Sequence, residues 1–330
     1  MKKPVFVIGG GGFIGRHLTA QLIASGEAVR VFDIIPCPQN MPAPIDWQQG
    51  SILDDAALDK AINGTKTVFH LAALAHLGVP QAGRYAQINT RGTQNVIKVA
   101  AKNNIDHLLI TSTEVILRDW RSKLTAPLTV GGDLPDMGGM AGPYCRSKLA
   151  AEHAARNAMN EGQPISLLYP TVPIGAGDYN LTAPTAMIRQ FLKAPPPAFL
   201  DCRLNLVPVE DVARAHILAA ANPAGGKYML GGEDIDMADL LGWLSELTDK
   251  TMPKNSIPYA LAAMTAHISS VGSKMSGKAP LASVEGVRLA RHKINIDSSP
   301  TTKILGWRQG SAREAVGRAA EWLAREGHLN

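Results

Sequence analysis

The chain has 330 residues, of which 45% are hydrophobic, and a formal net charge of +5 from 33 basic and 28 acidic residues. This length suits one large α/β domain or a main domain with a smaller partner, and we expect two lobes. Lysine and arginine are scattered without a long run, which argues against a nucleic-acid-binding protein. No apolar segment reaches the ~20 residues of a membrane-spanning helix, so membrane association is not expected.

The cysteines and the first residues bear on the cellular compartment. Cys37, Cys145 and Cys202 lie far apart and form no metal-binding pattern with histidines. The apolar residues 5–8 are followed by glycines too early for a signal peptide. We therefore expect a reduced, metal-free, cytoplasmic protein that binds a small molecule, and we leave a homodimer open.

Short β-branched runs alternate with helical patterns over the first 170 residues. Strands are predicted at residues 5–8, 28–32, 68–71, 107–111 and 165–169. Helices are predicted at residues 13–25, 54–62, 85–102 and 144–160. This order is typical of the α/β class and predicts a Rossmann-type, doubly wound parallel sheet, whose ligand binds at the carboxyl ends of the strands.

The composition changes after Pro170, with more proline, glycine and methionine and with helices separated by irregular stretches. We therefore predict a nucleotide-binding domain at residues 1–170 and a smaller, mostly helical C-terminal substrate lobe at residues 171–330. Residues 203–230 resemble a strand followed by a helix, and we expect them to return to the first domain.

A glycine-rich turn follows the first strand and leads into the first helix. Gly9, Gly12 and Gly15 form a GxxGxxG pattern, and Phe13 and Ile14 begin the helix. Glycines let the backbone approach a pyrophosphate, whose charge is favoured by the free N–H groups and dipole at a helix N-terminus. In this strand-turn-helix context, the pattern predicts a dinucleotide-binding site.

Asp33 ends the second strand, near the offset of roughly 20 residues expected of the acid that binds the adenosine ribose. A carboxylate that accepts from both ribose hydroxyls would repel the 2′-phosphate of NADP, so NAD is the predicted cofactor. Arg30 precedes the strand end, and strand alternation directs it away from the ribose. Ser51 and Ile52 either flank the adenine or form an ordinary strand-to-helix turn.

The second chemical motif opens the helix predicted near residue 144. Tyr144 and Lys148 are four residues apart, so they lie on one helix face. A neighbouring ammonium favours the phenolate form of a tyrosine, which makes it available as a general base. Hydroxyls that could hold a substrate oxygen follow the strand at 107–111, and we choose Ser112 as the catalytic hydroxyl with Thr113 in reserve.

At these residues the chain resembles the extended short-chain dehydrogenases/reductases, also called the NAD-dependent epimerase/dehydratase family. The resemblance covers nearly the whole chain. It is carried by the glycine motif, Asp33, the Tyr144 motif and residues 69–73, 89–95, 111–113, 170–171 and 207–213.

The resemblance implies further contacts to the cofactor. Lys148 would also bond the nicotinamide ribose, and the backbone after Pro170 would meet the carboxamide. Asn89 would lie near the cofactor or have a structural role inside its helix. The residues implied to line the cofactor site are Leu71, Ala72, Ala73, Asn89, Pro170 and Val172.

One departure from the family pattern affects the catalytic hydroxyl. Family members commonly carry Val-Tyr-Gly after the serine motif, whereas this chain has residues 114–118 in another pattern, so the choice between Ser112 and Thr113 stays open by one residue. Similar dehydratases use acids here for proton transfer, and Glu114 is therefore a candidate substrate-contacting residue, ranked below a structural role.

The segment at residues 169–178 resembles the branch of 3β-hydroxysteroid dehydrogenases, dihydroflavonol reductases and hopanoid-associated relatives. This resemblance implies reversible hydride transfer between nicotinamide and an apolar cyclic alcohol or ketone. A nucleotide-sugar epimerase is the alternative, and a non-catalytic NAD sensor is disfavoured by the intact Tyr144 and Lys148. Arg203 is the candidate for binding a phosphate or carboxylate, with Arg288, Arg291 and Lys293 further along the chain.

Overall fold

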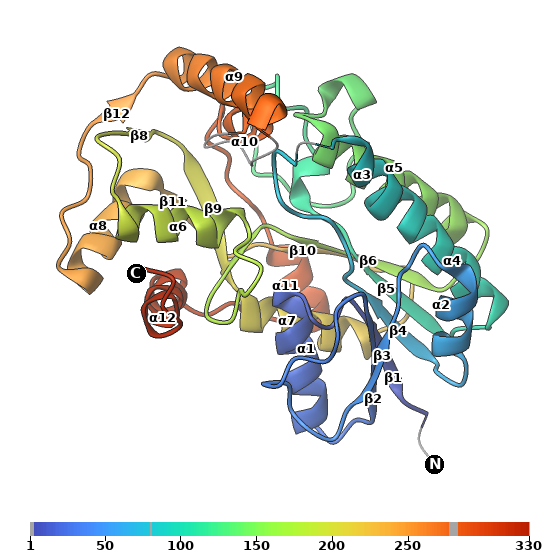
Figure 1. Ribbon diagram of the computed structural model, residues 1–330. Helices are drawn as coiled ribbons and strands as arrows, with labels where there is room; N and C mark the ends of the chain where they lie inside the picture. Colours follow the sequence, from blue (N-terminus) through green and yellow to red (C-terminus); the bar gives the residue numbers. More distant parts are fainter. Residues whose placement is uncertain (1–2, 80, 277–282, 330) are drawn as a thin grey trace.

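The structure is a computed structural model that describes residues 3–79, 81–276 and 283–329. Within these residues, a parallel sheet of seven strands has the order β10-β6-β5-β4-β1-β2-β3 (Figure 1). Its strands are β1 Val5–Ile8, β2 Val29–Asp33, β3 Asp46–Gln49, β4 Thr67–His70, β5 His107–Thr111, β6 Ile165–Pro170 and β10 Lys227–Leu230. This sheet confirms the predicted α/β class, and its order reverses between β1 and β4, where a ligand is expected.

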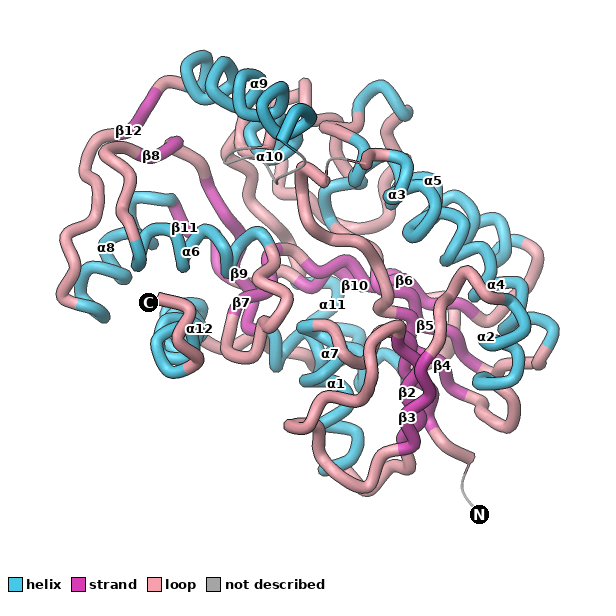
Figure 2. Tube along the Cα trace, viewed as in Figure 1, coloured by secondary structure: helices cyan, strands magenta, loops and turns pink. Residues whose placement is uncertain are grey.

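Helices cover both faces of the main sheet, as Figure 2 shows. One face carries α1 Phe13–Ala24, α7 Val209–Ala220 and α11 Ser299–Leu305, and the other carries α2 Asp55–Ile62, α4 Gly92–Lys102 and α5 Pro143–Asn160. Side chains alternate along β1, so Phe6 and Ile8 join one core cluster and Val7 joins the other. Strands covered on both sides need continuous apolar runs, which the sequence supplies.

The helix predicted at residues 85–102 has an irregular beginning. A short helix α3 Gly83–Tyr85 leads into the π-helical segment η1 Ala86–Arg91, and α4 follows. The sequence indicates only one helix here because the apolar positions on both segments face the same core. Single π-helical turns are uncommon and often occur at functional sites.

Most residues after Pro170, other than those of α7, β10 and α11, form a smaller, mostly helical part of the chain. Its helices are α6 Ala183–Lys193, α8 Met237–Thr248, α9 Tyr259–Ser276, α10 Val284–Leu289 and α12 Ala312–Arg325. Its strands are β7 Val172–Ile174, β9 Arg203–Pro208 and β11 Glu233–Asp236 in one sheet, and β8 Phe199–Leu200 paired with β12 Ser256–Ile257. Phe191, Leu244 and Trp322 belong to a separate core cluster of this lobe.

The segment at residues 203–230 divides between the two lobes. β9 pairs with β7 and β11, so residues 203–208 stay in the small sheet and do not join the main one. The return begins at α7, which packs against α1, and ends with β10 beside β6. The chain therefore re-enters the first domain at residue 209, later than the sequence pattern indicates.

Within the described ranges, no helix is long and apolar enough to cross a membrane. The acidic, histidine and cysteine side chains of the same residues form no group of three or more that could hold a metal ion. Cys145 and Cys202 are buried free thiols, and Cys37 is an exposed one.

Candidate active site

The turn after β1 is packed so closely that only glycine fits at two of its positions. Gly9 has φ +86°, and a Cβ placed on it would lie 2.6 Å from the Ala72 nitrogen. A Cβ on Gly15 would lie 2.1 Å from the Gly9 carbonyl oxygen. Helix α1 therefore begins against the end of β1. Gly12 caps it without a side-chain hydrogen bond, so the N–H groups at Phe13 and Ile14 have no side-chain acceptor and fit an anionic phosphate.

Asp33 is held at the rim of this turn by two backbone hydrogen bonds. Its Oδ2 accepts from the Gly11 N–H at 2.8 Å, and its Oδ1 accepts from the Ile35 N–H at 3.2 Å. These bonds orient the carboxylate beside the glycine turn. Arg30 points elsewhere, because its Nε donates to Asp46 at 2.6 Å, as strand alternation predicts.

Two segments predicted to border the cofactor have defined structural contacts. The Leu71 and Ala72 N–H groups both donate to the Ile8 carbonyl, at 2.9 and 3.1 Å, which fixes the chain after β4 at the end of β1. Ala73, the next residue, is exposed. Ser51 Oγ accepts from the Leu53 N–H, and Ile52 is buried in the core, so these two residues form a strand-to-helix turn.

Asn89 lies in η1 and is almost fully buried. Its Oδ1 accepts from the Leu74 N–H at 2.7 Å, and its Nδ2 donates to the Leu74 carbonyl and to Ser147 Oγ at 3.1 and 2.9 Å. These bonds occupy the side-chain amide and tie the loop after β4 to α5. The structure thus favours the structural role that the sequence leaves open for Asn89.

Tyr144 and Lys148 both lie in the first half of α5. Lys148 is buried, and its Nζ donates to the Thr111 carbonyl at 2.8 Å, which joins the helix to the end of β5. Burial lowers the pKa of Lys148 to about 8, although the carboxylate of Glu152 opposes this shift. Pro170 ends the neighbouring strand β6, and Val172 begins β7 beside it.

The pKa of Tyr144 departs from the sequence-based expectation. Burial raises it well above its ordinary value, and electrostatic interactions with Cys145, Glu114 and Glu285 raise it further. The Thr113 hydroxyl, which hydrogen-bonds the phenol, lowers it. The ammonium of Lys148 is directed at the Thr111 carbonyl and not at the phenol.

The two candidate hydroxyls point in opposite directions, because side chains alternate along extended backbone. Ser112 Oγ donates to Glu152 Oε2 at 2.8 Å and is buried behind the site. Thr113 has extended backbone, with φ −163°, and its hydroxyl lies at the Tyr144 phenol. The same hydroxyl donates to Glu114 Oε2 at 3.1 Å. The hydroxyl beside the phenol is therefore that of Thr113, the reserve choice, and the catalytic role of Ser112 or Thr113 stays a prediction.

Glu114 begins the short 3-10 helix η2 Glu114–Ile116 and is buried. Burial raises its pKa, while Arg118 and the Thr113 hydroxyl lower it. Its carboxylate thus lies beside the Thr113 and Tyr144 pair, and the structure leaves its role as a substrate contact a prediction.

Arg203 lies far along β9 and is occupied by other side chains. Its Nε donates to Asp236 at 2.8 Å, and its Nη1 donates to Asn295 at 2.6 Å. Lys293 pairs with Asp201 and Asp236 at 2.8 and 3.4 Å. The bond to Asp236 joins β9 to β11, and the role of Arg203 in binding a phosphate or carboxylate stays a prediction.

Glu152 is a functional candidate that the sequence reasoning missed. Its side chain is fully buried, and its carboxylate accepts from Ser112, Arg156 and Tyr169, with Arg156 Nε at 2.9 Å. It follows Lys148 by four residues, so it continues the helix face of Tyr144 and Lys148. This spacing is the signal that could have identified it.

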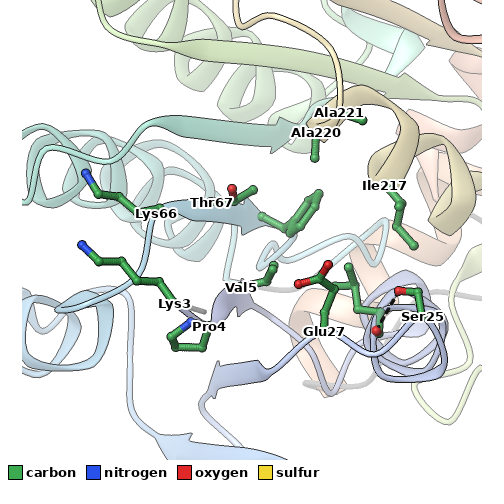
Figure 3. A pocket seen from close by; sticks show the side chains of 12 residues that line it. Lys3, Pro4, Val5, Ser25, Glu27, Lys66, Thr67, Ile217, Ala220 and Ala221 are labelled. Atoms are coloured by element: carbon green, nitrogen blue, oxygen red, sulfur yellow. Dashed lines mark hydrogen bonds between the residues drawn. The ribbon is translucent and has the colours of Figure 1, made fainter. Parts of the chain in front are cut away.

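The cavity in Figure 3 lies at the opposite edge of the main sheet. It has a volume of about 300 Å³ and is lined by residues at the amino ends of β1 and β4, including Val5 and Thr67. Lys66 at its rim pairs with Asp106 at 2.8 Å. Because parallel sheets bind ligands at their carboxyl ends, we assign this cavity no catalytic role.

Comparison with known proteins shows the family of the chain. Residues 5–231 match the NAD dependent epimerase/dehydratase family. The chain is 31% identical to a putative dihydroflavonol 4-reductase of Synechocystis sp., over 100% of this chain and 97% of the relative. It is 31% identical to the decarboxylating sterol-4-alpha-carboxylate 3-dehydrogenase of Candida albicans, over 66% of this chain and 64% of the relative.

The fold is also similar to a solved structure, that of gox2253. The two chains superpose with a TM-score of 0.81 at 26% sequence identity, and the match covers 100% of each chain. The arrangement of the main sheet and of the smaller lobe is therefore shared over the full length.

The position of Asp33 predicts the choice of cofactor. NAD should bind more tightly than NADP in calorimetric titrations, because the carboxylate would accept from the ribose hydroxyls and repel a 2′-phosphate. D33N should weaken NAD binding by about 1.5–3 kcal/mol, the range for a hydrogen bond to a charged group. D46N, which removes an acid on the neighbouring strand, is the matched control and should change neither affinity. Tighter binding of NADP to the unmodified protein would refute the assignment.

Proposed function

Since this chain belongs to the NAD dependent epimerase/dehydratase family and is an NAD-dependent oxidoreductase, we propose that it transfers a hydride between nicotinamide and a secondary alcohol or ketone on an apolar cyclic substrate. One observation carries this proposal. Thr113, Tyr144 and Lys148 lie together at the carboxyl edge of the main sheet, which is also the edge that holds the glycine turn.

The residues of the glycine turn fit NAD. The close approach of Gly15 to Gly9 and the uncapped start of α1 would receive the pyrophosphate, and Asp33 would receive the adenosine ribose. Lys148 would bind the nicotinamide ribose. When bound, the nicotinamide accepts or returns the hydride.

The protein's own groups handle the proton. Tyr144 takes the proton of the substrate hydroxyl during oxidation and returns it during reduction, while the Thr113 hydroxyl orients the substrate oxygen. Burial raises the pKa of Tyr144, so the neutral phenol is the form that the protein alone favours. The positive charges of Lys148 and of oxidised nicotinamide are the contributions that would lower this pKa.

Two observations support an apolar substrate. The two curated relatives are named for a dihydroflavonol and a sterol, which are both polycyclic. The basic residues that could hold a nucleotide diphosphate have other contacts: Arg203 and Lys293 pair with acids, and Arg288 and Arg291 lie over Trp120, 4.8 and 5.5 Å from the ring centroid. An apolar ring would gain affinity by leaving water, at ~25 cal/mol per Å² of apolar surface.

A panel of substrates tests this proposal directly. The protein and NAD would be incubated with 3β-hydroxysteroids and sterols, with dihydroflavonols, and with UDP- and dTDP-sugars, while NADH absorbance is followed. We expect NADH with at least one polycyclic alcohol. Conversion of a nucleotide sugar to its epimer without net NADH, detected by chromatography, would favour an epimerase instead.

The role of Tyr144 predicts the behaviour of Y144F. The ring still packs in this variant, so NAD affinity should be unchanged, whereas turnover should fall by ~10²–10⁴-fold, the usual contribution of a general acid or base. Steady-state kinetics and calorimetry check the two quantities. Turnover within a few-fold of the parent would place the base elsewhere, and Glu114 would be tested next.

The opposed directions of Ser112 and Thr113 allow a matched comparison. T113V keeps the shape and loses the hydroxyl beside Tyr144, so kcat should fall on the order of 10²-fold. S112A removes the donor to buried Glu152, so turnover should stay close to the parent while stability falls by about 1–3 kcal/mol. The reverse pattern in kcat would restore Ser112 as the catalytic hydroxyl.

A further inference from the structure

The helix that carries Tyr144 lacks a cap from its own sequence. Gly142, at the N-cap position, has no side chain, and Pro143 at the first helical position has no N–H. The next two N–H groups, on Tyr144 and Cys145, precede the first intrahelical acceptor. Buried N–H groups without partners would destabilise the start of α5.

Glu285 of α10 supplies both missing acceptors. Its Oε2 accepts from the Tyr144 N–H at 3.2 Å, and its Oε1 accepts from the Cys145 N–H at 2.8 Å. Glu285 is only 4% exposed. A Cβ on Gly142 would lie 2.5 Å from Glu285 Cδ, so the carboxylate can reach the helix only because this residue is glycine.

Neighbouring contacts hold α10 against the same part of the catalytic domain. Arg288 Nη1 donates to the Ala141 carbonyl at 3.0 Å, and its guanidinium lies over the ring of Trp120. Arg118 Nη2 donates to the Leu289 carbonyl at 3.2 Å. These contacts hold the last residues of α10, while Glu285 lies in its first turn; Figure 1 shows α10 beside α9.

We propose that Glu285 is a positioning residue for the proton transfer: it caps the catalytic helix from the C-terminal lobe and sets the charge at the first turn, beside Tyr144. This inference rests on the proposed role of Tyr144 as the base. The N-terminus of a helix carries partial positive charge that favours a phenolate, and a carboxylate bonded to its N–H groups offsets that charge.

Several other groups also face Tyr144, and their effects on its pKa have to be distinguished from the effect of Glu285. Glu114 approaches from η2 and Cys145 from α5, while Thr113 lies at the phenol. The ring centroid of Tyr85, at the end of α3, lies 6.2 Å from that of Tyr144, and burial raises the pKa of Tyr85. The nearby cations are Lys148, Arg118 and Arg288, which donate to backbone carbonyls. Burial, Cys145 and Glu114 are the larger causes that raise the pKa of Tyr144, and Glu285 raises it further.

The test compares charge removal with ordinary loss of a cap. E285Q removes the charge, and D54N is the matched control, because Asp54 also accepts from two first-turn N–H groups, those of Ala56 and Ala57 at the start of α2. Both variants should lower Tm by a few degrees. Only E285Q should make Tyr144 more acidic, since removal of a neighbouring negative charge favours the phenolate.

The titration of Tyr144 is measured without a substrate. Protein labelled with [13Cζ]tyrosine and saturated with NAD is titrated by NMR, and the Tyr144 signal is the one that Y144F lacks. We expect the Tyr144 pKa in E285Q to fall by about 0.5–1 unit, the lower end of shifts caused by a neighbouring charge. D54N should titrate with the parent.

G142A is a second route to the same displacement, because its added Cβ would push the carboxylate away while every charge is kept in the chain. It should shift the Tyr144 titration in the same direction as E285Q. If E285Q and G142A titrate no earlier than the parent, Glu285 is only a structural cap and the inference is wrong. High turnover in Y144F would instead refute the proposed function.

Discussion

Parallel pairing of the strands in the main sheet is the constraint on which the site depends. Because neighbouring strands run in one direction, the glycine turn after β1, Asp33 at the end of β2 and Thr113 after β5 all emerge at the same edge. Lys148 extends the arrangement to α5 through its bond to the Thr111 carbonyl. The cofactor fingerprint and the catalytic hydroxyl are thus brought together by backbone hydrogen bonds, before any side chain contributes.

Buried polar groups beneath this edge keep the reacting residues in place. Glu152 accepts hydrogen bonds from Ser112, Arg156 and Tyr169. Burial lowers the pKa of Lys148, and the negative charge of Glu152 partly offsets this shift. His216 bonds Thr111 Oγ1 at 2.8 Å, and burial lowers its pKa to about 4, so it stays neutral. Glu152, which is paired with Arg156, and the neutral His216 therefore hydrogen-bond residues near Lys148 without adding an unpaired buried charge.

The second lobe contributes to the first through specific contacts as well as by covering it. Arg203 of the small sheet, the cation that the sequence offers for a phosphate, is paired with Asp236 of the same sheet and with Asn295 beyond it. The same lobe returns an acid, Glu285, to the start of the catalytic helix. Charged side chains that have no partner nearby in the sequence are therefore bonded to residues far away in the chain.

The sequence by itself determined the elements whose signals are local. The glycine pattern, Asp33 and the Tyr144–Lys148 spacing predict the fold and the cofactor edge, since glycine freedom, strand alternation and helix periodicity act within a few residues. Tertiary structure directed Ser112 to Glu152 and Thr113 to the phenol, paired Arg203 with Asp236, raised the pKa of Tyr144 and brought Glu285 to its N–H. These outcomes depend on burial and on contacts between distant segments, which set desolvation and charge at each group and leave no periodic trace in the chain.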